Sequence, residues 1–217
     1  MHESLQQFHP VVDKWFEEKV GLPTPPQTLG WPVISAGKSC LILAPTGSGK
    51  TLAAFLAAID WLARRLLTAA EQEKILWGVQ ILYVSPLKSL ANDIQKNLLR
   101  PLKELEETAA AMSASWPEIQ VAVRTGDTPQ RERTAISRRP PHILITTPES
   151  LNLMLTSGGR NALATARFLI VDEVHALAGN KRGVFLSLLL ERLEEERRLL
   201  SDSPTGRLKI APGAPPG

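Results

Sequence analysis

The stretch with the clearest chemistry is Ala44-Pro-Thr-Gly-Ser-Gly-Lys50-Thr51, which follows an apolar run and opens a segment with helical spacing. Gly47 and Gly49 let the backbone turn with its N–H groups directed at phosphate oxygens, and a helix start adds partial positive charge. Lys50 is expected to reach the β and γ phosphates of ATP, and the Thr51 hydroxyl to ligate Mg²⁺. The alternative is a Gly-rich turn with a surface lysine, because Ala44 replaces the first glycine of the usual pattern. The loop predicts nucleotide contacts from Pro45, Thr46, Gly47, Ser48, Gly49, Lys50 and Thr51.

A second candidate site is Phe168-Leu-Ile-Val-Asp172-Glu173-Val-His175, an apolar run that ends in two acids. A strand of this kind places its final carboxylates at the carboxyl edge of a parallel sheet, where α/β proteins bind ligands. We expect Asp172 to hold Mg²⁺ through its water shell, and Glu173 to orient and deprotonate an attacking water. His175 is expected to lie near the γ phosphate as a coupling residue, the alternative being an ordinary surface histidine.

Several short apolar runs, rich in β-branched residues, predict the strands that position these groups. Nearly continuous hydrophobicity is typical of strands covered on both faces. Segments with helical spacing alternate with them, which predicts an α/β fold with a mostly parallel central sheet flanked by helices. The expected strands are residues 39–44, 79–85, 119–124, 143–147 and 168–172, and the expected helices are residues 51–67, 90–107 and 149–155.

Composition sets broad limits on the class of protein. The chain has 217 residues, 43% of them hydrophobic, which is enough for a sizeable core, and its net charge of +3 is compatible with a polyanionic partner. The single cysteine, Cys40, excludes an intrachain disulfide and is expected to be buried in the strand at residues 39–44. No run reaches the roughly 18 apolar residues of a membrane span, so we expect no membrane partner and a cytoplasmic location.

Together, these motifs resemble those of superfamily 2 nucleic-acid helicases. The resemblance implies a three-layer RecA-like domain. It also implies that Gln27 contacts the adenine edge of ATP, and the alternative is that Gln27 is an exposed polar residue of a loop. Ser85-Pro-Leu-Lys-Ser-Leu, Arg124-Thr-Gly-Asp-Thr and Thr146-Thr-Pro-Glu-Ser look like the family's three strand-contacting motifs. The residues that this implies for contact with single-stranded DNA or RNA are Pro86, Lys88, Ser89, Thr125, Gly126, Thr147, Pro148 and Glu149.

Three longer stretches narrow the resemblance to the large helicase-related (Lhr) proteins. They are PTGSGKTLAAF, SPLKSLAND and VDEVHAL followed by Lys181-Arg-Gly-Val. Membership would imply an ATP-driven motor that moves 3′ to 5′ on single strands and is associated with DNA repair. Such motors hold ATP and the strand between two RecA-like lobes, and this sequence matches only the first. We therefore expect a truncated member, a fragment or the product of an interrupted gene, which needs a second lobe in cis or in trans.

The expected organisation has three parts: a helical lead-in at residues 1–23, the RecA-like domain at residues 24–200, and a disordered Pro/Gly-rich tail at residues 201–217. Residues 24–27 (TPPQ) are expected to form a loop ahead of the first strand. Two other functions remain open at this stage. One is a non-catalytic nucleic-acid or protein interaction module that retains the fold, and the other is a phosphate-loop ATPase unrelated to nucleic acids.

Overall fold

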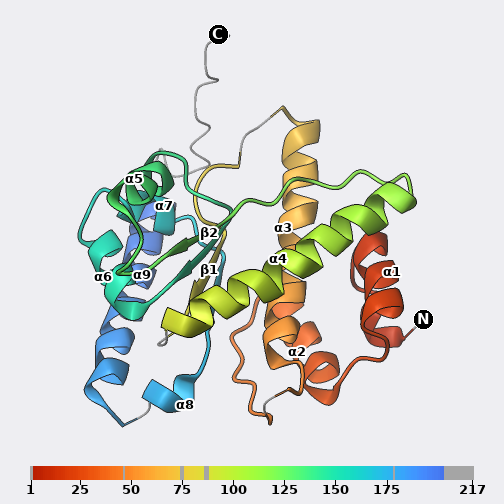
Figure 1. Ribbon diagram of the computed structural model, residues 1–217, viewed down its shortest axis with the longest axis horizontal. Helices are drawn as coiled ribbons and strands as arrows, with labels where there is room; N and C mark the ends of the chain where they lie inside the picture. Colours follow the sequence, from red (N-terminus) through yellow and green to blue (C-terminus); the bar gives the residue numbers. More distant parts are fainter. Residues whose placement is uncertain (1, 46, 74–75, 86–87, 178, 203–217) are drawn as a thin grey trace. The chain divides into compact units, whose positions relative to one another are not determined.

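The computed structural model describes residues 2–45, 47–73, 76–85, 88–177 and 179–202, and for residues 88–97 and 200–202 the backbone only. The chain forms two compact units. The first comprises residues 1–68 and 97–118, and the second comprises residues 69–96 and 119–217. Figure 1 labels the helices and strands of both units.

The first unit is helical in its described part and packs around aromatic residues. Trp31 is fully buried and makes edge-to-face contacts with Phe8 and Phe16, with ring centroids 5.0 and 5.4 Å apart. The indole N–H of Trp31 donates to the carbonyl of Ala53 at 3.1 Å, which ties two helices together. The helices are η1 (Glu3–Leu5), α1 (Pro10–Lys19), α2 (Pro25–Ser35), most of α3 (Lys50–Glu71) and the later part of α4 (Lys88–Ala111).

The structure corrects three expectations in this unit. Residues 24–27 are the start of α2, because prolines are favourable in the first turn of a helix and Gln27 completes a capping box with Thr24. Residues 39–44 form no strand, and Leu41 and Leu43 are 70% and 84% exposed. Since the described part of this unit contains no sheet, the apolar run has no neighbouring strand to pair with there. Cys40 is exposed for the same reason.

The second unit contains a four-stranded parallel sheet with the strand order β2-β3-β1-β4. Its strands are β1 (Ile81–Val84), β2 (Val121–Arg124), β3 (Ile143–Thr146) and β4 (Phe168–Val171). These lie within four of the predicted runs and confirm the parallel α/β fold. Parallel strands need crossover connections, and the intervening helices provide them. The helices are α5 (Gln130–Arg138), α6 (Pro148–Leu155), α7 (Arg160–Leu163), α8 (Val174–Leu177) and α9 (Lys181–Asp202).

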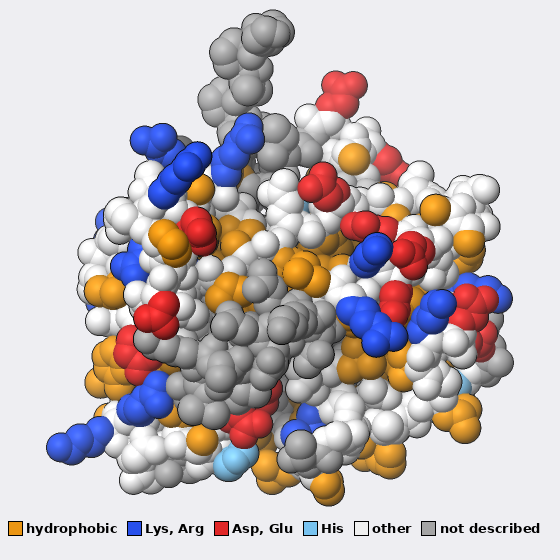
Figure 2. All heavy atoms as spheres, viewed as in Figure 1, with side chains coloured by type: hydrophobic (Ala, Val, Ile, Leu, Met, Phe, Trp, Pro, Cys, Tyr) orange, Lys and Arg blue, Asp and Glu red, His pale blue; other side chains and the backbone are white. Residues whose placement is uncertain are grey.

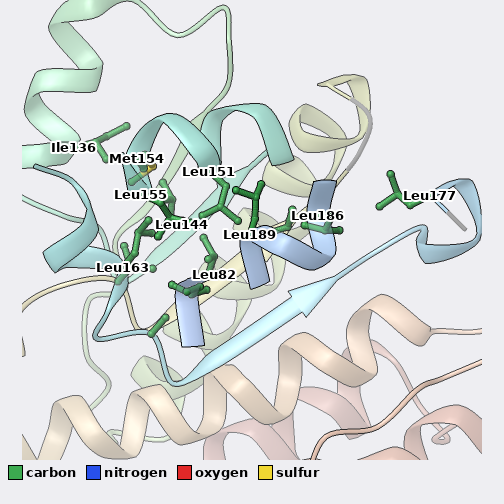
Figure 3. Packing of buried hydrophobic residues seen from close by; sticks show 14 residues of the cluster. Leu82, Ile136, Leu144, Leu151, Met154, Leu155, Leu163, Leu177, Leu186 and Leu189 are labelled. Carbon is green, nitrogen blue, oxygen red and sulfur yellow. The ribbon is translucent and has the colours of Figure 1, made fainter. Parts of the chain in front are cut away.

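Alternate residues of the strands face a hydrophobic cluster made with α6, α7 and α9 (Figures 1 and 3). Leu82 and Leu144 are paired in register on the sheet and point into this cluster. Leu151 and Leu155 of α6 and Leu189 of α9 meet them there. In β1 and β3 the residues between, such as Tyr83, are fully buried as well, so these two strands are covered on both faces as their sequences predicted. Most residues of β2 and β4 are only partly buried.

The predicted helices are confirmed within α3, α4 and α6. Helix α9 carries a run of charged residues at 191–198, in which Glu191, Arg192, Glu194 and Glu195 are exposed. Helix α9 continues to Asp202, two residues into the segment expected to be a tail, and residues 203–217 lie outside the described part. Within the described ranges, no helix combines the length and apolarity that crossing a membrane requires.

Candidate nucleotide and strand-binding site

The four strands of the second unit end together at one edge of the sheet. Val84 of β1 is opposite both Thr146 of β3 and Val171 of β4, and Arg124 of β2 is opposite Thr146. The residues that follow these ends are the motifs singled out in the sequence: Ser85, the turn at residues 125–128, Thr147 and Asp172. The carboxylate motif and the described starts of all three predicted strand-contacting motifs therefore share one edge, as expected for a parallel sheet.

The Asp172 carboxylate is held from two sides. Its Oδ2 accepts a hydrogen bond from the Tyr83 hydroxyl at 2.6 Å, and its Oδ1 accepts one from the Glu173 backbone N–H at 2.8 Å. Burial raises the pKa of Tyr83 far above its ordinary range, and the neighbouring Asp172 and Glu173 carboxylates raise it further. Tyr83 is therefore a fixed hydrogen-bond donor at neutral pH, and Asp172 is fixed in position for an incoming ligand.

Glu173 and His175 lie next to Asp172 and contact each other. The Glu173 Oε2 is 3.1 Å from the His175 Nε2, and the His175 side chain is 82% exposed. Glu173 has a φ of +53°, a left-handed conformation that is uncommon for a residue with a side chain. The backbone thus turns sharply at the residue expected to act on water, directly before helix α8 begins.

The phosphate loop belongs to the first unit and contains the expected backbone turn. Gly47 and Gly49 have φ values of +81° and +82°, which explains why glycine occupies both positions. Lys50 begins α3, and its Nζ donates to the carbonyl of Pro45 at 2.8 Å and also to the carbonyl of Ala44. Thr51 is the second residue of the same helix. Thr46 lies outside the described residues.

Gln27 and Thr24 brace this loop from the start of α2. Gln27 is 1% exposed; its Oε1 accepts from the Thr24 N–H at 2.9 Å and its Nε2 donates to the Gly49 carbonyl at 3.5 Å. The Thr24 hydroxyl donates to the Ser48 carbonyl at 2.8 Å. A Cβ on Gly49 would lie 2.7 Å from the Gln27 Nε2, so a side chain at this position would displace the Gln27 amide. The contact of Gln27 with adenine stays a prediction, since its amide here supports the loop.

The predicted strand-contacting residues differ in their accessibility. Thr147 is 1% exposed and caps α6 by accepting from the Ser150 N–H at 3.4 Å, and Pro148 is buried. Glu149 is half exposed and paired with Arg182 at 2.8 Å. Burial acts to raise the pKa of Glu149, but hydrogen bonds from its own backbone N–H and from Arg182 lower it overall. Pro86 lies outside the described residues, as do the side chains of Lys88 and Ser89.

Three supporting residues were not predicted from the sequence. Tyr83 carries a weak signal, since a hydroxyl in an otherwise apolar buried strand needs a partner. Thr24 has a clearer one, because Thr-Pro-Pro-Gln fits the pattern of a capping box with proline in the first turn. Nothing in the sequence indicates the role of Arg182 beyond its place in the Lys-Arg-Gly segment, because a contact with Glu149, 33 positions away, cannot be deduced from spacing.

On the face seen in Figure 2, the described basic side chains are interspersed with acidic ones. A modest net charge of +3 is consistent with this mixture. The described side chains on this face therefore form no single-sign patch that would by itself attract a polyanion.

A parallel sheet with acids at its carboxyl edge, together with a phosphate loop at a helix start, defines the chain as a nucleotide-binding α/β domain of the RecA-like type. Residues 24–207 match the family model described as DEAD/DEAH box helicase. The chain belongs to the DEAD/DEAH box helicase family.

Its similar relatives and structures include helicases of the Lhr type. The chain is 48% identical over 209 residues to the "Lhr helicase/ probable uracil glycosylase" of Mycolicibacterium smegmatis, covering 96% of the chain and 13% of that protein. It is 50% identical over 184 residues to the "ATP-dependent helicase Lhr-Core protein 2" of Thermococcus barophilus, covering 84% of the chain and 21% of that protein. The structure of Mycobacterium smegmatis helicase Lhr bound to ssDNA and AMP-PNP matches with a TM-score of 0.82 and 48% identity, over 90% of this chain and 24% of that one. The chain thus spans 13% and 21% of the lengths of these two relatives.

Proposed function

We infer that this chain is the ATP-binding domain of an Lhr-type helicase, in which ATP hydrolysis drives movement along a single nucleic-acid strand. The observation that carries this inference is the shared edge of the sheet. Asp172, which is expected to serve the nucleotide, and the turn at residues 125–128, which is expected to serve the strand, follow strands that end in register. The matching Lhr structure holds ssDNA and AMP-PNP, which supports both ligands for this chain.

The nucleotide is assigned to residues of both sequence motifs. Gly47 and Gly49 give the loop a backbone conformation suited to phosphate, and Lys50 supplies a positive charge at the start of α3. To serve a phosphate, the Lys50 Nζ must exchange its bonds to the Ala44 and Pro45 carbonyls for bonds to phosphate oxygens. Gln27 is the proposed contact for adenine, in addition to its support of the loop.

The donor set fits Mg²⁺, a hard cation that prefers oxygen ligands and retains several waters. Thr51 offers a hydroxyl, and the two oxygens of Asp172 are held by Tyr83 and by the Glu173 N–H with lone pairs remaining for an ordered water shell. When bound, Mg²⁺ would neutralise charge on the β and γ phosphates. Glu173 is proposed to orient and deprotonate the attacking water, and its contact with His175 holds that carboxylate in place.

The strand is proposed to follow the sheet edge of the second unit. Exposed Gly126 and half-exposed Thr125 can approach a strand backbone directly, and Glu149 is accessible beside Arg182. Thr147 and Pro148 shape the start of α6 rather than offer exposed side chains. Lys88, Ser89 and Pro86 complete the proposed contacts. We assign single-stranded DNA or RNA as the ligand, 3′ to 5′ movement, a place in DNA repair and a cytoplasmic location as parts of the same proposal.

A second RecA-like lobe, in cis or in trans, is the proposed partner. Phosphoryl transfer at phosphate-loop sites gains much of its rate from arginine side chains outside the loop, and a second lobe would supply them. The 217-residue chain alone should therefore bind ATP weakly, hydrolyse it very slowly and unwind nothing.

The test is titration of the purified chain with a fluorescent ATP analogue and Mg²⁺, with and without single-stranded DNA. Lys50→Ala should weaken binding at least about tenfold, corresponding to roughly 1.4 kcal/mol. Lys38→Ala is the matched control, because Lys38 is an exposed lysine of the same unit outside the loop. Equal binding by the Lys50→Ala variant would refute the nucleotide site. Rapid strand-stimulated hydrolysis by the chain alone would refute the need for a second lobe.

One observation favours a second candidate, a non-catalytic module that retains the fold. Lys50 donates to carbonyls of its own loop, and residues 39–44 ahead of that loop are not paired as a strand. If this arrangement persisted with nucleotide present, the chain would bind a strand without responding to ATP. Salt-sensitive binding of single-stranded DNA that ATP and Mg²⁺ leave unchanged would favour this candidate over the first.

A further inference from the structure

The turn at residues 125–128 is organised by its own polar groups. The Thr125 N–H donates to the Thr128 hydroxyl oxygen at 2.9 Å, and the Thr128 N–H donates to the Thr125 carbonyl at 3.3 Å. The Asp127 N–H donates to the Thr125 hydroxyl oxygen at 3.3 Å. Gly126 is exposed, and its N–H makes no hydrogen bond within the described residues. The turn therefore leaves one backbone donor available to a ligand.

Arg133, on the following helix α5, clamps this turn through two backbone carbonyls. Its Nε donates to the Thr128 carbonyl at 2.7 Å, and its Nη2 donates to the Gly126 carbonyl at 2.6 Å. The planar guanidinium presents donors in a fixed fork, so two bonds to two carbonyls fix the turn against the helix. The peptide unit before Asp127 and the peptide unit after Thr128 are thereby held in one orientation.

The charges around the turn support an anionic ligand. Arg124, the residue before the turn, is 8% exposed, and its Nη1 has no hydrogen-bond partner among the residues that the structure describes. Burial lowers the pKa of Arg124, and the positive charge of Arg133 lowers it further. Two guanidinium groups close to one turn repel each other, and a bound anion would offset that repulsion.

We propose that Arg133 is a positioning residue for strand binding, which holds the turn so that the Gly126 N–H donates to a backbone phosphate of the single strand. Arg133 acts through the turn and does not itself contact the phosphate. The inference rests on the proposed function, since it requires that the chain bind a strand. Arg131, on the same helix, is expected to have no such role, because it is exposed and makes no side-chain hydrogen bond in the described part of the chain.

The experiment measures the affinity of the full chain for fluorescein-labelled oligothymidylate by anisotropy over a series of salt concentrations. Arg133→Ala should weaken binding by about fivefold to tenfold, the size expected for a lost hydrogen bond. The slope of log affinity against log salt should stay unchanged, because a neutral backbone donor releases no counterions. Arg131→Ala removes the same charge two residues away and measures what charge alone contributes.

Arg133→Lys provides the second variant. It retains the charge, but an ammonium cannot reproduce the fork, so affinity should stay close to that of Arg133→Ala. Hydrogen exchange at residues 125–128 should be faster in both Arg133 variants than in Arg131→Ala, a difference that needs no ligand.

The inference would be overturned by full affinity in Arg133→Lys or by equal losses in the two alanine variants. A salt slope lowered by about 0.7 in Arg133→Ala would also overturn it, because that change is the sign of a direct phosphate contact on a single strand. Failure of the unmodified chain to bind any strand would instead overturn the proposed function. A wild-type chain that binds, beside an Arg133→Ala variant that binds equally well, would overturn only the role of Arg133.

Discussion

Replacing Tyr83 with phenylalanine tests the link between β1 and the acid at the end of β4. The Tyr83 hydroxyl is the donor to Asp172 Oδ2 at 2.6 Å, and phenylalanine keeps the ring in a position that is fully buried. The variant therefore removes one hydrogen bond and leaves the packing of the ring intact. Because Asp172 also keeps its bond from the Glu173 N–H, its carboxylate loses one of two described donors.

The expected cost follows from the charge of the acceptor and its exposure. A hydrogen bond to a charged group contributes about 1.5–3 kcal/mol, and since Asp172 is only half-buried, water can take part of the place of the hydroxyl. We therefore expect the free energy of unfolding in urea to fall by about 1.5 kcal/mol at neutral pH. A double-mutant cycle with Asp172→Ala should assign most of that loss to the pair.

The pH dependence provides an independent check. In the folded chain the pKa of Tyr83 is raised above its ordinary value, so its contribution to stability is fully present below about pH 10 and is lost above it. The difference in stability between the native chain and Tyr83→Phe should be constant up to about pH 9 and then shrink by roughly 1.4 kcal/mol per pH unit. A coupling energy between Tyr83 and Asp172 below about 0.5 kcal/mol would show that their hydrogen bond contributes little to stability. The same would follow if the stability difference between the native chain and Tyr83→Phe did not change at alkaline pH.

Two further predictions concern the starts of helices, one in the first unit and one in the second. The His9 Nδ1 caps α1 by accepting from the Val11 N–H at 3.3 Å, and burial lowers the pKa of His9. The contribution of this cap to the free energy of unfolding should be fully present above about pH 6.5 and should fall as the ring protonates below that pH. Urea unfolding over a series of pH values measures it. His9→Asn should retain the cap and remove this acid sensitivity, and an unchanged pH profile would contradict the assignment. In the second unit, a Cβ on Gly183 would lie 2.2 Å from the Leu177 carbonyl oxygen, so Gly183→Ala should cost about 2 kcal/mol or more. Gly158→Ala is the control, because a Cβ there meets nothing within 4 Å, and its free energy of unfolding should stay within about 0.5 kcal/mol of that of the native chain. Equal melting temperatures of the two variants would count against the clash at Gly183.

The sheet of the second unit was predictable because its strands are short, apolar on both faces and separated by helices. Because the carboxyl ends of parallel strands share one edge, the sequence alone places Asp172 and the turn at residues 125–128 at the same edge. The strand at residues 39–44 could not be judged in the same way. Hydrophobicity predicts burial only if a neighbour accepts the backbone hydrogen bonds, and the sequence does not say whether one is present.

The supporting contacts were harder to predict than the motifs they support. Gln27 was singled out for adenine, yet its most evident role here is local, because a capping box with Thr24 places its amide against the phosphate loop. Arg133 looks like one of several basic residues on a polar helix, and only its two bonds to backbone carbonyls distinguish it. Contacts between elements depend on tertiary geometry, which a motif in one element does not contain.

The left-handed backbone at Glu173 has a consequence for how this domain can change over time. A residue with a side chain at a φ of +53° carries a conformational cost of about 1 kcal/mol or more, which glycine would relieve. Selection for stability alone would therefore favour losing the carboxylate at this position. A lineage that no longer needed the chemistry should drift to glycine or asparagine here early, while Asp172, held by Tyr83 and a backbone N–H, should persist longer. The residue at position 173 would then serve as a marker of whether a relative still turns over nucleotide.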